Sequence, residues 1–250
     1  MDKKKIITVS ISTIVVLGIM LIGGYSYMYS HGLSGKYANK EVTDGQIKVA
    51  CIGDSITYGH GVENWKKNNY PAQLQELLGD EYHVANFGSS GACLNPKGDQ
   101  PYVNREIYQE SLMYDADILI VMLGTNDSKP ENWTSMEHFI EEYMSFIHNY
   151  YQGEKLPKVY IGLCAEAFYT EDADKSTGIA GFDIQPAIVD EIAYSLSNGL
   201  PACDCALTVS GVIDIHSLTE AHPEWFEADG IHPNAEGAKA IAEAVADAIK

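Results

Sequence analysis

The stretch DILIVMLG at residues 117–124 decides the fold of this chain. Apolar residues run through it almost without a break, and Gly124 ends it. A short, continuous apolar run that ends at a glycine is typical of a strand covered on both faces of a parallel sheet. We therefore predict a central strand at residues 117–123.

Apolar runs alternate with helical patterns on both sides of this strand. Further strands are predicted at residues 47–52, 82–87, 158–163 and 207–215. Helices are predicted at residues 70–78, 104–114, 136–151, 184–196 and 234–249. Strands that alternate with helices pair in parallel through right-handed crossovers. The expected fold is α/β, a three-layer α/β/α sandwich with a five-stranded parallel sheet, formed by one domain at residues 46–250.

The composition narrows the class of protein. The chain has 250 residues, of which 46% are hydrophobic, and a formal net charge of -19. This length and apolar fraction suit one domain with a sizeable core. Phosphate binding needs a clustered basic surface, so the acidic balance argues against nucleic acid as a partner. The five cysteines are irregularly spaced, which excludes a disulfide-dense scaffold, and the pair Cys203 and Cys205 is weak evidence for a metal or redox role.

The N-terminus has the pattern of a membrane anchor. Residues 6–25 carry no charge and follow a lysine cluster, and about 20 apolar residues are enough to cross a bilayer as a helix. Lysines before such a span predict that the N-terminus stays inside and the domain lies outside. We predict a basic cytoplasmic tip at 1–5, a transmembrane signal anchor at 6–25 and a linker at 26–45. The alternative is a cleaved signal peptide, which would release a secreted domain.

Polar motifs fall in loops next to the predicted strands and before the last helix. They are GDSIT at 53–57, NFG at 86–88, GTND at 124–127 and DGIHP at 229–233. In an open α/β sheet, function collects where the strands end. We therefore expect these four loops to meet in one site.

Together the loops supply the parts of an acyl-transfer site. A serine hydroxyl needs a base within reach, and His232 can take the proton of Ser55. Asp229, three residues before His232, can fix the tautomer and orientation of its ring. The Ser55 N–H, the Gly88 N–H and the Asn126 side-chain amide can bind the oxyanion that forms during the reaction.

These motifs resemble the SGNH/GDSL hydrolase superfamily, and the resemblance covers nearly all of residues 46–250. It implies that Ser55 is the nucleophile, that Gly88 and Asn126 complete the oxyanion hole, and that Asp229 and His232 are the acid and base. It also implies a flavodoxin-like sheet. The chemistry implied is hydrolysis of esters and thioesters without a metal or cofactor.

A finer resemblance is to bacterial carbohydrate esterases of the sialate O-acetylesterase-like type. It depends on YPAQL at 70–74, NFGSSGA at 86–92, LGTNDSKPENW at 123–133 and DGIHPNAEGA at 229–238. The chain departs from the expected proline-rich pattern at CAEAFY, residues 164–169, and the loop to about residue 182 then becomes acidic. The resemblance therefore bears more strongly on the reaction than on the substrate.

Several further residues are candidates for contact with a sugar. Trp65, Trp133 and Phe168 are loop aromatics whose faces suit sugar rings, although packing explains loop aromatics equally well. Asn95 could meet a polar substrate, and Arg105 could do the same. Asp54 is expected to brace the loop beside Ser55, and His60, His216 and His222 lack a partner at metal-ligand spacing, so we expect no metal.

The leading hypothesis is a bacterial serine esterase, anchored in the cell membrane or secreted, that removes short acyl groups, above all O-acetyl, from carbohydrate. One alternative keeps the chemistry but changes the substrate, as in a lysophospholipase or thioesterase of the same superfamily. The other is an inactive surface protein that binds glycans.

Overall fold

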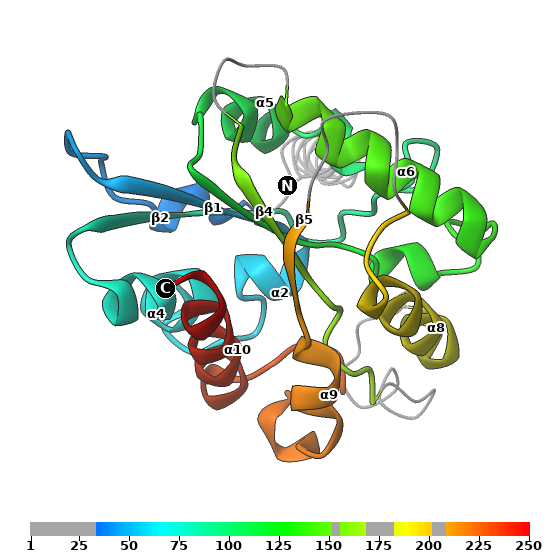
Figure 1. The fold of residues 1–250 in the computed structure, drawn as a ribbon. Coiled ribbons are helices and arrows are strands. Elements are labelled where there is room, and N and C mark those ends of the chain that lie inside the picture. Colours follow the sequence, from blue (N-terminus) through cyan, green and yellow to red (C-terminus); the bar gives the residue numbers. More distant parts are fainter. Residues whose placement is uncertain (1–33, 152–155, 169–182, 202–208) are drawn as a thin grey trace, which may run out of the picture.

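The computed structural model describes residues 34–151, 156–168, 183–201 and 209–250 (Figure 1). The predicted signal anchor, the pair Cys203 and Cys205, and the acidic part of the loop before residue 182 lie outside these ranges. Within the described ranges, no helix is long and apolar enough to cross a membrane.

Five parallel strands form the central sheet in the order β2-β1-β3-β4-β5. They are β1 (Ile47–Gly53), β2 (Tyr82–Gly88), β3 (Ile118–Met122), β4 (Lys158–Gly162) and β5 (Val209–Ile213). β3 lies in the middle, and all of its residues are buried. The prediction of an α/β fold with a five-stranded parallel sheet is confirmed.

Helices cover both faces of the sheet (Figure 1). The α-helices are α2 (Ser55–Tyr58), α3 (Trp65–Asn68), α4 (Tyr70–Leu78), α5 (Glu106–Met113), α6 (Met136–His148), α8 (Pro186–Ser197), α9 (Ile215–Glu220) and α10 (Ala235–Ile249). The 3₁₀ helices are η1 (Gly35–Ala38), η2 (Tyr102–Asn104), η3 (Asn126–Ser128), η4 (Asn149–Tyr151) and η5 (Pro223–Trp225). α5, α6 and α8 lie on one face, and α4 and α10 lie on the other. This is the predicted three-layer sandwich.

The strand β3 explains why the core has two parts. Its residues Leu119 and Val121 pack toward α5, α6 and α8, whereas Ile118, Ile120 and Met122 pack toward α4 and α10. Successive side chains of a strand point to opposite faces, so a sheet covered on both sides needs apolar residues at every position. The continuous apolar run in the sequence follows from this requirement.

The strand order places a crevice between β1 and β3. From β1 the chain moves outward to β2, and then crosses over to β3 on the other side of β1. Connections that diverge in this way leave a crevice at the carboxyl ends of the two strands, where ligands of α/β proteins bind. Ser55 follows β1 and Asn126 follows β3, so both lie at this point.

The outer edge of β2 is covered by side-chain amides. Gln75 accepts a hydrogen bond from the Val84 N–H at 2.8 Å. Asn39 accepts from the Asn86 N–H at 2.6 Å and donates to the Asn86 carbonyl at 3.1 Å. These amides take positions that the backbone of a neighbouring strand would otherwise occupy.

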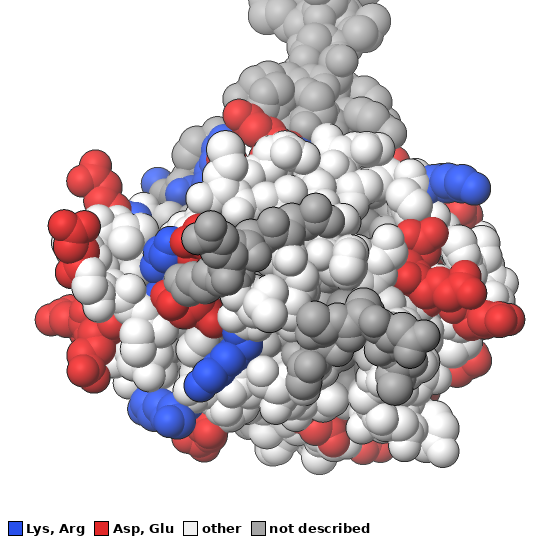
Figure 2. All heavy atoms as spheres, turned by 45° about the horizontal axis from the view of Figure 1, so that its top comes forward, with Lys and Arg blue, Asp and Glu red and all other residues white. Residues whose placement is uncertain are grey.

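The segment from residue 34 to 40 differs from the predicted linker. Ser34 pairs with Ser89 in an antiparallel bridge, and the Lys36 ammonium lies 2.7 Å from a Glu110 carboxylate oxygen. These contacts join the segment to the domain, so the folded unit begins before residue 46. The surface remains acidic, with carboxylate side chains spread over both flanks of the face in Figure 2.

Candidate active site

Ser55 stands at the first position of α2, directly after β1. Asp54 caps this helix, and its Oδ1 accepts the Ile56 N–H at 2.9 Å. Gly59 ends the helix after one turn in a left-handed conformation, with φ 93°, which glycine adopts without steric cost. Backbone N–H groups in the first turn of a helix have no acceptor within the helix. The Ser55 N–H is therefore available to an oxyanion.

His232 is held by a local turn before α10. The Asp229 Oδ1 accepts the N–H groups of Ile231 at 2.9 Å and of His232 at 3.0 Å. The Asp229 Oδ2 lies 2.7 Å from Nδ1 of His232, and Nε2 of the same ring lies 2.8 Å from the Ser55 Oγ. The structure thus brings together the three side chains predicted to form a triad.

The hydrogen bonds among Asp229, His232 and Ser55 indicate where the hydrogen of the His232 ring lies. An ionised carboxylate only accepts, so Nδ1 of His232 carries a hydrogen, and in the neutral ring Nε2 is then the acceptor that faces the hydroxyl of Ser55. Burial opposes ionisation of Asp229, but the hydrogen bond from His232 and the two backbone donors outweigh it and lower its pKa to about 2. His60 lies beside this histidine with ring centroids 4.5 Å apart, and burial followed by the charge of His232 lowers the pKa of His60.

A cavity of about 140 Å³ opens over the serine. Its lining consists of Ser55, His60, Ser90, Gly91, Gln100, Thr125, Asn126, Lys129, Ile184, Ile231 and His232. Pockets for drug-sized ligands measure roughly 300–1,000 Å³, so this one suits a small group. A larger cavity of about 410 Å³ lies beside α3 and α4, but none of the triad residues lines it. The chemistry therefore identifies the smaller cavity as the site.

Asn126 faces the cavity from η3. Its Nδ2 donates to the Asp54 Oδ2 at 3.3 Å, and its carbonyl accepts from the Asn132 Nδ2 at 2.8 Å. An amide nitrogen has two hydrogens, so the contact with Asp54 leaves one for a substrate oxygen. Burial raises the pKa of Asp54 to about 6, against the hydrogen bond from Ile56. The contacts of Asp54 agree with the expected bracing role.

Gly88 does not lie at the oxyanion-hole position predicted from the sequence. Its N–H donates to the Asn86 side-chain oxygen at 2.9 Å, and it does not line the cavity. A Cβ atom at this position would lie 2.2 Å from the Tyr58 nitrogen. Gly88 thus lets α2 pack closely against β2, and the expectation that its N–H faces the substrate is corrected.

Gly91, three residues further along the chain, lies at the cavity around Ser55 instead of Gly88. It lines the cavity with φ 77°, and its N–H has no acceptor among the described residues. Asp127 anchors the loop, because its carboxylate accepts the N–H groups of Leu94 and Asn95 at 2.9 Å. Burial raises the pKa of Asp127 to about 6, and those same bonds oppose the rise. The second glycine of Gly-Ser-Ser-Gly was the available sequence signal.

Asn95 and Trp133 lie outside the cavity. The Asn95 Nδ2 donates to the Asn132 carbonyl at 2.8 Å, and its side chain is buried. Trp133 packs beside Phe139, with ring centroids 6.3 Å apart. Both residues line a separate shallow hollow near α6. The structure does not bring them to Ser55 as substrate-binding residues.

The other two aromatic candidates pack against neighbouring rings. Trp65 lies 4.7 Å from Tyr58, and Phe168 lies 5.1 Å from Phe226, in each case between ring centroids. Neither lines the cavity around Ser55. For these two residues the packing interpretation is the better one.

Arg105, His216 and His222 each contact a polar side chain. The Arg105 guanidinium donates to the Gln100 side chain, which itself lines the cavity. The Nε2 of His216 lies 3.4 Å from a Glu166 oxygen and 3.6 Å from an Asp190 oxygen, which sequence spacing could not reveal. The Nδ1 of His222 lies 2.8 Å from Glu224. That the protein needs no metal stays a prediction.

Comparisons with known proteins identify the family of this chain. Residues 51–240 match the model of the GDSL-like Lipase/Acylhydrolase family. An acetylxylan esterase of Xylanibacter ruminicola is 37% identical over 209 residues, which cover 82% of this chain and 43% of that protein. The chain thus spans less than half the length of this relative.

Solved structures share the fold. A carbohydrate acetylesterase family member from Sinorhizobium meliloti superposes with a TM-score of 0.58 at 22% identity, covering 81% of this chain and 96% of the other. A carbohydrate esterase family 3 protein from Talaromyces cellulolyticus has a TM-score of 0.58 at 15% identity, covering 81% and 95%. Because the family model matches residues 51–240, which is more than half of the chain, this chain belongs to the GDSL-like lipase/acylhydrolase family.

Proposed function

We propose that this protein is a serine esterase that removes acetyl groups from carbohydrate. The observation that carries the proposal is the hydrogen-bonded chain from Asp229 through His232 to Ser55, which ends at a small cavity. The relative described as an acetylxylan esterase makes acetylated xylan the first substrate to test.

The reaction follows from the positions of these groups. The Ser55 Oγ attacks the ester carbonyl while Nε2 of His232 takes its proton, and Asp229 stabilises the imidazolium that forms. The same nitrogen then protonates the departing sugar oxygen, which leaves an acetyl-serine. Water enters, loses a proton to His232 and attacks the acetyl carbon; the bond to Ser55 then breaks, His232 returns the proton to the Ser55 Oγ, and acetic acid leaves as acetate after losing its proton to solvent.

Three donors support the oxyanion in this scheme. They are the Ser55 N–H, the Gly91 N–H and the second hydrogen of the Asn126 amide, and all three residues line the cavity. Donors that are fixed before the reaction stabilise the developing charge without reorganisation. Asp54 and Asp127 act behind them, by holding Asn126 and the loop that contains Gly91.

The size and lining of the cavity favour a short acyl group. Its volume is about 140 Å³, and among the residues that the structure describes its large aliphatic lining is Ile184 and Ile231. A methyl group can pack against these side chains, whereas a long acyl chain would need a continuous apolar channel. No specific observation favours the lysophospholipase or thioesterase alternative.

The proposed place of action is outside the cytoplasm of a bacterium. The uncharged segment at residues 6–25 after a lysine cluster supports either a membrane anchor or a cleaved signal peptide. A protein in that place would meet an acetylated polysaccharide outside the cell.

The test compares hydrolysis of 4-nitrophenyl acetate and octanoate by wild type, Ser55→Ala and the exposed control Ser197→Ala. We expect hydrolysis that prefers acetate, is abolished in Ser55→Ala and is unchanged in Ser197→Ala. A preference for octanoate would move the assignment to lipids. Glycan binding with no hydrolysis of either ester or of acetylated xylan would favour the inactive scaffold.

A further inference from the structure

Lys129 is a buried cation at the edge of the catalytic cavity. Its residue exposure is 5%, and it lines the same cavity as Ser55 and His232. Lysine is almost never fully buried unless its charge is paired. The partner is Asp99, whose Oδ2 lies 3.3 Å from the Lys129 Nζ.

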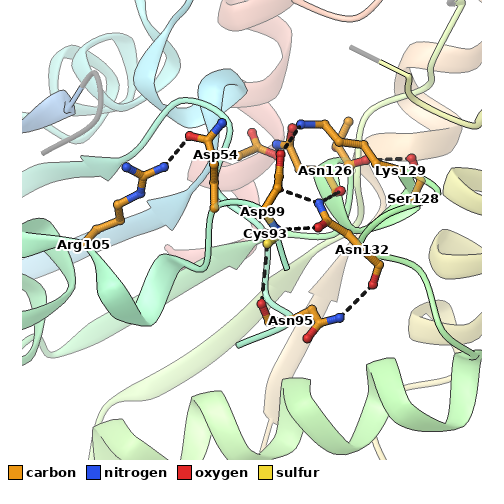
Figure 3. A network of polar contacts seen from close by, with 11 residues as sticks. Asp54, Cys93, Asn95, Asp99, Arg105, Asn126, Ser128, Lys129 and Asn132 are labelled. Atoms are coloured by element: carbon orange, nitrogen blue, oxygen red, sulfur yellow. Dashed lines mark hydrogen bonds and ion pairs between the residues drawn. The ribbon is translucent and has the colours of Figure 1, made fainter. Parts of the chain in front are cut away.

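Asp99 is itself held in place by Asn132, as Figure 3 shows. The Asn132 Nδ2 donates to the Asp99 Oδ1 at 2.8 Å, and the Asp99 N–H donates to the Asn132 Oδ1 at 2.7 Å. The same Asn132 amide group also donates to the carbonyl of Asn126. One network therefore connects the ammonium of Lys129 with the backbone of the oxyanion-hole residue.

The Lys129 ammonium has more N–H donors than hydrogen-bond acceptors around it among the described residues. It carries three N–H groups, and Asp99 is its one hydrogen-bond acceptor among the described residues. Burying donors without partners costs free energy, whereas a hydrogen bond from a charged group is about twice as strong as one between neutral groups. The Lys129 ammonium is therefore arranged to receive an acceptor atom that a ligand brings into the cavity.

The chemistry of the cavity indicates which part of the substrate supplies that atom. Ile184 and Ile231 form its aliphatic wall, which suits an acetyl methyl group that makes no hydrogen bonds. Lys129 and Gln100 belong to its polar lining, which suits the alcohol part of the ester.

The charge of the site favours a neutral acceptor over an anion. Asp99 already balances the charge of Lys129. The chain as a whole carries a formal charge of -19, which repels polyanions. A hydroxyl oxygen of a neutral sugar fits these conditions better than a carboxylate.

We propose that Lys129, positioned by Asp99, donates a hydrogen bond to a free hydroxyl next to the acetylated position of a neutral sugar. The proposal rests on the function proposed above and makes Lys129 a specificity-determining residue. Because an aryl ester has no such hydroxyl, Lys129 should set the preference for sugar esters over aryl esters.

The first experiment measures kcat/KM for acetylated xylo-oligosaccharide and for 4-nitrophenyl acetate. Lys129→Met keeps the length of the side chain and removes the ammonium, and Lys97→Met is a control at an exposed lysine. The ratio of sugar ester to aryl ester should fall about 10- to 100-fold in Lys129→Met, as one charged hydrogen bond predicts. It should stay unchanged in Lys97→Met. Equal loss on both esters would overturn the proposal, because a merely structural ion pair predicts that result.

A second experiment needs only the wild-type enzyme. Methyl xyloside acetylated at O3 is compared with its 2-deoxy and 4-deoxy analogues. Removal of one neighbouring hydroxyl should lower kcat/KM about 10- to 100-fold. If neither deoxy analogue differs from the parent, the proposal is overturned even when Lys129→Met does not fold. Failure of the proposed function would look different, because the wild-type enzyme would then not hydrolyse the parent sugar ester, or Ser55→Ala would hydrolyse it equally well.

Discussion

Replacing Asp229 with Asn should stop catalysis while keeping the turn intact. The Asn Oδ1 can still accept the N–H groups of Ile231 and His232, so the loop keeps its shape. The amide nitrogen, however, would face Nδ1 of His232 at the 2.7 Å contact and would donate to it. The ring would then hold its hydrogen on Nε2 and could not take the proton of Ser55.

The expected loss in kcat for Asp229→Asn is about 10⁴-fold, the figure known for the same substitution in a serine protease triad. At about 1.4 kcal/mol per decade, this equals roughly 5 kcal/mol of transition-state stabilisation. The assay is hydrolysis of 4-nitrophenyl acetate at neutral pH, with the exposed Asp247→Asn as the control. Thermal unfolding monitors the fold of both variants. A kcat within roughly tenfold of wild type in folded Asp229→Asn would refute the tautomer argument.

Two further predictions concern the oxyanion donors and the pH dependence of stability. Asn126→Ala should lower kcat for acetyl esters about 10²- to 10³-fold, because one donor is lost, and a kcat equal to wild type would remove Asn126 from the oxyanion hole. The pKa of Asp229 is lowered to about 2 in the folded protein, against about 3.9 in an unfolded chain. Its ionised form therefore stabilises the fold above pH of about 4, and this contribution is lost as the pH falls toward 2. Urea unfolding across that range should show the difference in unfolding free energy between wild type and Asp229→Asn becoming smaller, and a constant difference would contradict the assignment.

The main elements could be predicted because their sequence patterns are long and uniform. The strand predicted at residues 47–52 corresponds to β1 (Ile47–Gly53), and the helix predicted at 234–249 corresponds to α10 (Ala235–Ile249). The one-turn helix α2 and the six-residue helix α9 were not predicted, because a segment of so few residues shows no usable period.

The candidate site was predictable where it depends on local geometry. Asp229 and His232 are three residues apart in one turn, so their contact could be inferred from spacing. Which of Gly88 and Gly91 lies at the cavity could not be inferred from spacing. It depends on the Asn86 side chain and on the carboxylate of Asp127, which anchors the loop from a distant position in the sequence.

The same limit explains why the network around Lys129 was missed. Its ion pair with Asp99 joins positions 30 residues apart, and no pattern in the sequence indicates this contact. For loop aromatics such as Trp65, the sequence predicted a contact that the structure does not show. Their residue type suggested sugar contact, whereas only their neighbours reveal that they pack against other rings.

The amides along the outer edge of β2 have a consequence for the behaviour of the protein in solution. An open edge strand offers a ladder of backbone groups to which another chain can add, and this is a common route to aggregation. Here Gln75 and Asn39 already occupy positions of that ladder. Asn39 comes from the segment before the predicted domain boundary. This short stretch therefore helps to prevent strand addition between molecules at the β2 edge of the sheet.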